Sequence, residues 1–246
     1  MLAATKVKLE PGRLLIAGRW VETVKKFDSI NPATAEVLTE ISVASGEDVD
    51  RAVGAARHAF EDRNGAWRKL SAGERGRLIW KLADLLENNI DEFAELETLD
   101  NGKPIFESRY VDMPMVVDVL RYYAGWATKT YGETVNTFET AFTYTLREPV
   151  GVVGMIVPWN FPLLLASWKL GPALACGNTV VWKPASQTSL TALCFGELAV
   201  EAGVPAGVLN IVTGPGEVGR AMVKHPGIDK HAAISIRGCL RSDAEC

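Results

Sequence analysis

Cysteine is scarce in this chain, with four residues in 246 and none in Cys-x-x-Cys spacing. Disulfide-stapled domains and zinc ribbons need more cysteines at closer spacing, so the sequence argues against both. His231 lies near Cys239, but two ligands do not make a metal site. We therefore predict a protein without a bound metal, in a reducing compartment such as the cytoplasm.

An excess of positive charge is also missing. Lys and Arg number 26 against 30 Asp and Glu, which gives a formal net charge of −4. No basic stripe appears along the chain, so nucleic acid is not expected as a partner. Residues 1–12 carry charges and have no apolar segment of signal-peptide length.

One long segment lacks charged residues altogether. Residues 149–168 hold none across 20 positions, which is long enough to span a membrane. Pro158 and Pro162 interrupt this segment, and in lipid they would leave backbone groups of a helix unpaired. We therefore predict a buried strand, a turn and a helix, and no membrane association. A membrane span is the alternative.

Capping boxes mark the starts of two predicted helices in the first half of the chain. Ser45 pairs with Asp48 and Ser71 with Glu74, each pair standing before apolar residues at helical spacing. The other elements predicted in this half are a strand over 14–21 with a turn at Gly18-Arg19, a short strand over 27–30, and helices over 91–99 and 116–126.

Residues 137–147 differ in character from these helices. Phe138, Phe142 and Tyr144 belong to a mostly alternating, β-prone pattern, which predicts an extended arm. The arm is either a surface hairpin or a strand that pairs with another subunit, and the sequence favours neither.

From Gly151 onward an apolar strand and a helix alternate three times. Short loops between such units imply right-handed crossovers and a parallel sheet that is covered on both faces. The predicted fold class is α/β, a doubly wound, Rossmann-like parallel sheet with N-terminal helices and an extended β arm. The strands are predicted over 152–157, 178–182 and 208–212, and the helices over 163–174, 189–202 and 217–224.

Loops at the carboxyl ends of these strands carry candidate site residues, because open α/β sheets bind ligands there. Asn160 follows the first strand between two aromatics and two prolines, a rigid loop suited to aim an amide at an oxyanion. The alternative is an asparagine that bonds its own turn. Lys183 follows the second strand and could donate to ribose or phosphate, or could be a solvated loop lysine.

The loop after the third strand matches Gly-x-Gly-x-x-Gly at Gly214, Gly216 and Gly219. It follows a strand and opens a helix, as a dinucleotide-binding loop does. The usual motif follows the first strand, however, and the acidic residue expected further on is missing at that spacing. A tight turn with a close helix approach accounts for the glycines at least as well as phosphate binding does.

Taken together, these motifs resemble the aldehyde dehydrogenase superfamily. The resemblance is specific, because many multi-residue motifs occur in the family's order, from about Leu14 to Lys230. The motifs are Asn-Gly-Lys-Pro at 101–104, Arg-Tyr-Tyr-Ala-Gly-Trp at 121–126, Pro-Trp-Asn-Phe-Pro at 158–162, Trp-Lys-Leu-Gly-Pro-Ala-Leu at 168–174, Lys-Pro-Ala at 183–185, Glu-Ala-Gly-Val-Pro at 201–205 and Gly-Val-Leu-Asn at 207–210.

The resemblance implies an oxidoreductase that oxidises an aldehyde to a carboxylic acid with NAD or NADP. A cysteine attacks the aldehyde, hydride passes to the nicotinamide, and water hydrolyses the thioester. An aldehyde substrate and a homo-oligomer are implied for the full-length parent.

Individual residues take roles from the same resemblance. Asn160 matches the oxyanion donor, Lys183 the lysine on the adenosine ribose, and Lys169 a lysine near the active site. Ser186 stands where many NAD-preferring members have a glutamate that would repel a 2′-phosphate, which leaves NADP open. The loop along the cofactor is matched by Ile156, Val157, Pro158 and Trp159.

The resemblance stops after Lys230. The family would continue into a fourth strand, a Gly-Ser-Thr phosphate loop, the general base and the cysteine nucleophile, whereas residues 231–246 read differently. Cys176 and Cys194 have the surroundings of packed core thiols. We therefore expect a truncated chain that is inactive alone. The alternative is a non-catalytic nucleotide-binding or structural fragment.

The chain is thus expected to have four parts: a helical and strand region (1–136), the arm (137–150), a partial cofactor domain (151–230) and a divergent tail (231–246). A sheet of three parallel strands would leave one of them, for instance 208–212, at an open edge. The tail offers only Ile234 and Ile236 as a replacement strand. Poor stability and association follow from the apolar helix surface expected to be uncovered, on Leu190, Leu193 and Leu198.

Overall fold

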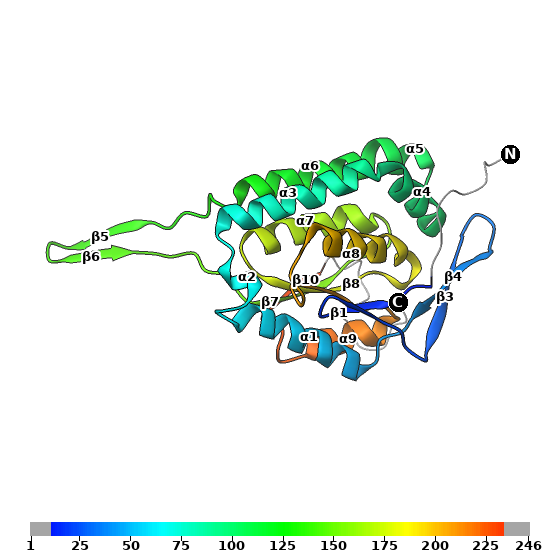
Figure 1. Cartoon of the computed structure of the whole chain (residues 1–246), viewed down its shortest axis with the longest axis horizontal. Coiled ribbons are helices and arrows are strands. Elements are labelled where there is room, and N and C mark those ends of the chain that lie inside the picture. The colour runs from blue at the N-terminus through cyan, green and yellow to red at the C-terminus, as the bar shows by residue number, and fades with distance from the viewer. Residues whose placement is uncertain (1–10, 234–246) are drawn as a thin grey trace.

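The computed structural model describes residues 11–233 and is built around one mixed six-stranded sheet (Figure 1). Four parallel strands lie in the order β10-β7-β8-β9, and the hairpin β1–β2 extends the sheet beyond β9 by antiparallel pairing. The predicted α/β fold with a doubly wound parallel sheet is confirmed. The strands are β1 Leu14–Ile16, β2 Arg19–Val21, β7 Val152–Ile156, β8 Thr179–Lys183, β9 Leu209–Ile211 and β10 Lys230–Ala233.

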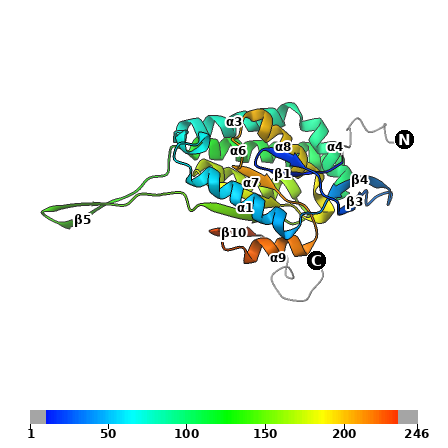
Figure 2. The ribbon, with the colours of Figure 1, turned by 60° about the horizontal axis from the view of Figure 1, so that its bottom comes forward.

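Helices cover both faces of the sheet (Figures 1 and 2). On one face α7 and α8 pack under a second layer formed by α3, α4 and α6, while α1 and α9 lie on the other face. The helices are α1 Gly46–Glu61, α2 Ala66–Lys69, α3 Ala72–Asn88, α4 Ile90–Asn101, α5 Ile105–Glu107, α6 Met113–Trp126, α7 Pro162–Ala175, α8 Leu190–Ala202 and α9 Gly216–Lys224, with a π-helical turn η1 at Ser108–Asp112 and a 3₁₀ turn η2 at Ser186–Thr188.

The core divides into two clusters, one on each face of the sheet, because successive strand residues point to opposite faces. In β7, Met155 belongs to the cluster that includes the α7 and α8 side chains, whereas Val152 belongs to the cluster that includes those of α1 and α9. In β8, Trp182 and Val181 divide in the same way. The alternation explains why the strands are apolar along their whole length.

Both predicted capping boxes are present. Ser45 Oγ accepts from Asp48 N at 3.2 Å, and Ser71 Oγ accepts from Glu74 N at 3.3 Å. The uncharged segment 149–168 runs into β7, a turn and α7, as predicted. Within residues 11–233 no helix is both long enough and apolar enough to cross a membrane.

The predicted arm is a hairpin that projects from the body (Figure 1), with strands β5 Thr134–Phe138 and β6 Ala141–Tyr144. Its apolar side chains lie open, with Phe138 72% and Phe142 80% exposed. The surface hairpin is therefore present, and pairing with another subunit stays a prediction. A second hairpin joins β3 Lys26–Ile30 to β4 Val37–Ser42.

Two expectations about uncovered surface are wrong. The strand expected at an open edge, β9, is covered by β1, where Leu15 pairs with Ile211. Leu190, Leu193 and Leu198 are buried, because α3 and α4 pack against α8. The strand that covers β9 and the helices that cover α8 all come from the N-terminal region. No local signal in the sequence revealed where this region packs.

The number of parallel strands also needs correction. A fourth strand, β10, begins at Lys230, where the resemblance was expected to stop, and runs parallel to β7. Ile234 and Ile236, the expected replacement strand, lie outside the described residues. Among the described residues, the edges of the sheet are therefore β10 and β2.

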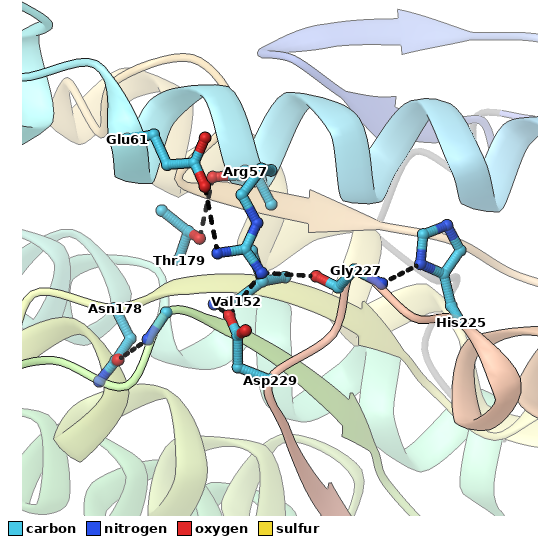
Figure 3. A network of polar contacts seen from close by, with 10 residues as sticks. Arg57, Glu61, Val152, Asn178, Thr179, His225, Gly227 and Asp229 are labelled. Atoms are coloured by element: carbon cyan, nitrogen blue, oxygen red, sulfur yellow. Dashed lines mark hydrogen bonds and ion pairs between the residues drawn. The ribbon is translucent and has the colours of Figure 1, made fainter.

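A polar network at the amino ends of the parallel strands holds β10 in place (Figure 3). Asp229 Oδ2 accepts from Val152 N at 2.7 Å and from Arg57 Nη2 at 2.6 Å, and Arg57 also donates to Gly227 O at 2.9 Å. Gly151 has φ of 133°, and a Cβ there would lie 2.0 Å from Asp229 Oδ2. The position of this carboxylate therefore requires a glycine beside it.

Candidate functional site

The carboxyl ends of β7, β8 and β9 lie side by side and bring the candidate residues together. The edge of the sheet that these strand ends form is called the carboxyl edge, in contrast to the outer strands β10 and β2. Ile156 is in register with Lys183, and Val157 N donates to Lys183 O at 3.1 Å. On the other side, Val212 N donates to Trp182 O at 2.9 Å. Three loops predicted from separate motifs thus meet here, at 156–160, 183–186 and 212–216.

Lys183 is a buried residue at this edge, only 6% exposed. Its Nζ donates to Pro184 O at 3.1 Å, and its stem lies against α9, where a Cβ added to Gly219 would be 3.5 Å from Lys183 Cδ. The same Cβ would be 3.7 Å from Ile156 Cδ1. The alternative of a solvated loop lysine is therefore wrong, and the ammonium is held close to the ends of the strands.

The glycine motif separates into two parts in the structure. Gly214 has φ of 139°, and a Cβ there would lie 2.8 Å from Val218 Cγ2. A tight turn and a close helix approach therefore account for Gly214. Gly216 opens α9, and a Cβ there would have only Arg220 Nη1 nearby, at 3.8 Å, so packing does not require a glycine.

Ser186 begins the short turn η2 and is partly exposed. Its Oγ lies 3.4 Å from Gln187 Oε1, to which it donates a hydrogen bond. Ser186 lies three residues after Lys183, in the loop that follows β8.

The loop after β7 carries Asn160 between Trp159, which is exposed, and Phe161, the N-cap of α7. Asn160 Oδ1 is buried, and within residues 11–233 no donor reaches it. An asparagine that bonds its own turn would have this acceptor paired. The contacts of Asn160 therefore do not support that alternative. Pro158 is partly buried at the start of the loop.

Lys169 lies on α7, the helix that follows the Asn160 loop. Its Nζ donates to Leu165 O at 3.0 Å, within the same helix. Partial burial lowers the pKa of Lys169 from its usual value. The helix that Asn160 precedes also carries Lys169, but no hydrogen bond among the described residues joins the two.

A buried charge cluster lies beside this loop and was not predicted from the sequence. Lys103 Nζ lies 3.1 Å from Glu97 Oε1 and 2.5 Å from Asp112 Oδ2, and all three side chains are at most 7% exposed. Burial raises the pKa of Glu97, against the attraction of Lys103. One signal was readable: Glu97 follows Phe93 by four residues and so falls on the buried face of α4.

The chain is similar in sequence to known proteins. A sequence model described as the aldehyde dehydrogenase family matches residues 20–238. The mitochondrial aldehyde dehydrogenase of Mesocricetus auratus is 52% identical over 223 residues, which are 89% of this chain and 44% of that protein. The mitochondrial aldehyde dehydrogenase of Homo sapiens is 51% identical, with 89% and 43% covered.

A solved structure extends the agreement to the fold. The aldehyde dehydrogenase of Bacillus cereus in complex with NAD+ superposes with a TM-score of 0.88 at 48% identity, over 90% of this chain and 45% of that one. The chain thus spans about half the length of the relatives it matches. Because the family match covers most of its residues, the chain belongs to the aldehyde dehydrogenase family.

Proposed function

We propose that this chain provides the cofactor-binding edge and the oxyanion donor of an NAD(P)-dependent aldehyde dehydrogenase, which oxidises an aldehyde to a carboxylic acid through a cysteine thioester. The observation that carries the proposal is the convergence of Ile156, Val157, Lys183 and the Asn160 loop at one edge of the parallel sheet. Ligands of open α/β sheets bind at this edge.

The donors present fit a dinucleotide. Lys183 offers a buried ammonium and Ser186 a hydroxyl, the groups that ribose hydroxyls and phosphates accept from. Gly219 lies against the Lys183 stem, and Gly216 leaves the start of α9 open. Solved relatives in complex with NAD+ support the choice of cofactor. When bound, the nicotinamide accepts hydride from the substrate.

Asn160 is the residue proposed to act on the substrate. Its amide stands at the end of a loop fixed by Pro158 and Pro162, so little reorganisation is needed when negative charge develops on the aldehyde oxygen. The buried Oδ1 has no partner among the described residues and can accept from a donor outside them, which leaves Nδ2 to donate to the aldehyde oxygen. Loss of one such donor typically costs about 10²–10³-fold in turnover.

The cysteines within residues 11–233 are poorly suited to serve as the nucleophile. Burial raises the pKa of Cys194 to about 12, which suppresses the reactive thiolate at neutral pH. Cys176 precedes β8, whereas Lys183 ends it. A five-residue strand rises roughly 13 Å between its end residues, so Cys176 lies at the opposite end of the strands from Asn160. We therefore propose that this chain alone does not oxidise aldehydes.

Calorimetric titration with NAD+ and NADP+ tests the cofactor edge. Lys183→Ala is expected to weaken binding roughly 10- to 100-fold, since a hydrogen bond to a charged group contributes about 1.5–3 kcal/mol. Lys224→Ala, at an exposed lysine in the last turn of α9, is the matched control and should leave binding unchanged. Equal affinities of wild type and Lys183→Ala would contradict the assignment.

A dehydrogenase assay on the same preparation tests the statement on activity. We expect no formation of NADH or NADPH with short aliphatic or aromatic aldehydes. Turnover that is lost on Cys176→Ser or Cys194→Ser would show that a cysteine of this chain is a nucleophile after all.

A further inference from the structure

The Asn160 loop is held from outside the sheet by the last residue of α4 and the segment that follows it. Asn101 Nδ2 donates to Trp159 O at 2.6 Å, on one side of Asn160. Lys103 Nζ lies 4.6 Å from the centroid of the Phe161 ring, on the other side. The two residues that flank Asn160 are therefore each fixed by a side chain from residues 101–103.

Lys103 has its own position set by two buried carboxylates. Glu97 Oε1 and Asp112 Oδ2 each accept a hydrogen bond from Lys103 Nζ, at 3.1 and 2.5 Å. An ammonium has three donors, which leaves the third for the face of the Phe161 ring. Asp112 ends the π-helical turn η1, and π-helical turns are rare and occur frequently at functional sites.

Stability alone gives a weak reason for this cluster. Two carboxyls and one ammonium are removed from water, and Glu97 Oε2 is buried without a partner among the described residues. Apolar residues of similar volume in such places are often as stable or more stable. A rigid, directed ammonium is what the cluster provides and apolar packing does not.

We propose that Lys103 is a positioning residue: held by Glu97 and Asp112, it fixes the Phe161 ring and, together with Asn101, sets the orientation of Asn160. The inference rests on the proposed role of Asn160 as the oxyanion donor. The attachment of the loop is measured without cofactor or aldehyde. The positioning role of Lys103 can therefore be disproved while the proposed function stands, and the proposed function can be disproved while the attachment of the loop stands.

Fluorine NMR on the full chain labelled with 4-fluorophenylalanine reads the Phe161 ring directly, with the resonance assigned by Phe161→Leu. The test variant combines Lys103→Met, Glu97→Gln and Asp112→Asn, which removes the ammonium without leaving buried carboxylates unpaired. We expect the Phe161 resonance to move by more than its line width while the others stay. Lys103→Arg, made alone in the wild-type chain, keeps the charge and should retain much of the wild-type chemical shift of Phe161.

Lys81→Met is the matched control, because it removes an ammonium that donates to Ala202 O, 3.0 Å away, at the end of α8. It should leave the Phe161 resonance in place. A folded triple variant with an unmoved Phe161 resonance would overturn the proposal and leave Lys103 a purely structural residue.

Asn101→Ala keeps the buried charges balanced and so tests the loop even where the triple variant does not fold. Hydrogen exchange of the amides in 157–161, followed by mass spectrometry, should become several-fold to about tenfold faster, as loss of one hydrogen bond against local opening predicts. Exchange in 157–161 at the wild-type rate would overturn the attachment.

Discussion

Ser186 is the residue at which cofactor choice is most open to experiment. It is partly exposed at the start of η2, so a longer side chain can extend towards solvent. Ser186→Glu would add a carboxylate that accepts from a ribose 2′-hydroxyl and repels a 2′-phosphate. We predict a shift of the NAD+/NADP+ affinity ratio towards NAD+ by roughly tenfold, measured by paired titrations.

Ser186→Gln is the control for side-chain length without charge and should change the ratio little. An unaltered ratio in Ser186→Glu would mean that this side chain does not face the ribose.

Asp100 is a buried carboxyl held by neutral hydrogen-bond donors. Its Oδ1 accepts from Ser29 Oγ at 2.6 Å and its Oδ2 from Leu190 N at 2.8 Å, which links α4 to β3 and to the start of α8. Burial raises the pKa of Asp100 to about 6 against these hydrogen bonds, from an ordinary value of 3.8.

This shift gives a pH dependence of stability with a definite sign. Asp100 holds its proton more tightly in the folded chain than in the unfolded chain. The contribution of protonated Asp100 to the free energy of unfolding is therefore complete below pH 3.8 and is lost as pH rises through about 6. In Asp100→Asn the amide keeps both bonds, because Ser29 can reverse its hydroxyl. We predict that the variant gains up to about 3 kcal/mol relative to wild type between about pH 4 and pH 7.

Urea unfolding at several pH values in that range measures the difference, with Asp118→Asn at an exposed position on α6 as the control. Parallel pH profiles for wild type and Asp100→Asn would show that Asp100 does not titrate in this window.

At the scale of elements, β10 depends on the network at its amino end (Figure 3). Arg57→Ala removes the donor to Asp229 and Gly227 and, among the described residues, leaves only Val152 N on that carboxylate. Because the pair is about one third exposed, we predict a loss of about 1–2 kcal/mol in the free energy of unfolding.

The control is Arg220→Ala, whose pair with Glu217 lies on the exposed surface of α9 and should contribute less than about 1 kcal/mol. Hydrogen exchange localises the effect: faster exchange should appear in residues 230–233. Equal stabilities of the two variants would mean that β10 is held by its pairing with β7 alone.

Elements with local signals were predictable from the sequence, and their assembly was not. Ser45 and Ser71 mark helix starts because their caps involve residues three positions away. The insertion of β1 beside β9 depends on pairing between Leu15 and Ile211, which no local pattern encodes. The same holds for α8. Leu193 is visibly apolar in the sequence, but the helices that cover α8 come from far earlier in the chain.

The candidate site shows the same division. Asn160 and Lys183 could be selected because strand ends in a parallel sheet meet at one edge. The cluster of Glu97, Lys103 and Asp112 could not, since it depends on a π-helical turn that changes which residues of η1 face α4. Charged residues near a helix end are usually solvated, and only tertiary packing buries these.

At the scale of the whole molecule, the arm formed by β5 and β6 offers a surface for self-association. Phe138 and Phe142 stand exposed on a hairpin that contacts little of the body (Figure 2). We predict that Phe138→Ser with Phe142→Ser reduces association of the chain by at least about tenfold, because exposed aromatic area of this size favours burial.

Sedimentation velocity over a concentration series measures this association. Val24→Ser with Val200→Ser replaces exposed apolar side chains away from the arm and should leave it unchanged. Association that persists in the arm variant would direct attention to the edges at β2 and β10.

The mixed sheet also sets the time at which this fold can close. Ala17 N donates to Asn210 Oδ1 across 193 residues of sequence, so the β1–β2 hairpin waits for almost the whole chain before its place beside β9 exists. At roughly 5–20 residues per second of synthesis, that wait is about 10–40 s. During this wait the apolar residues Leu14–Ile16 have no sheet to join. A chaperone or a helix that folds earlier can shield these residues in that interval.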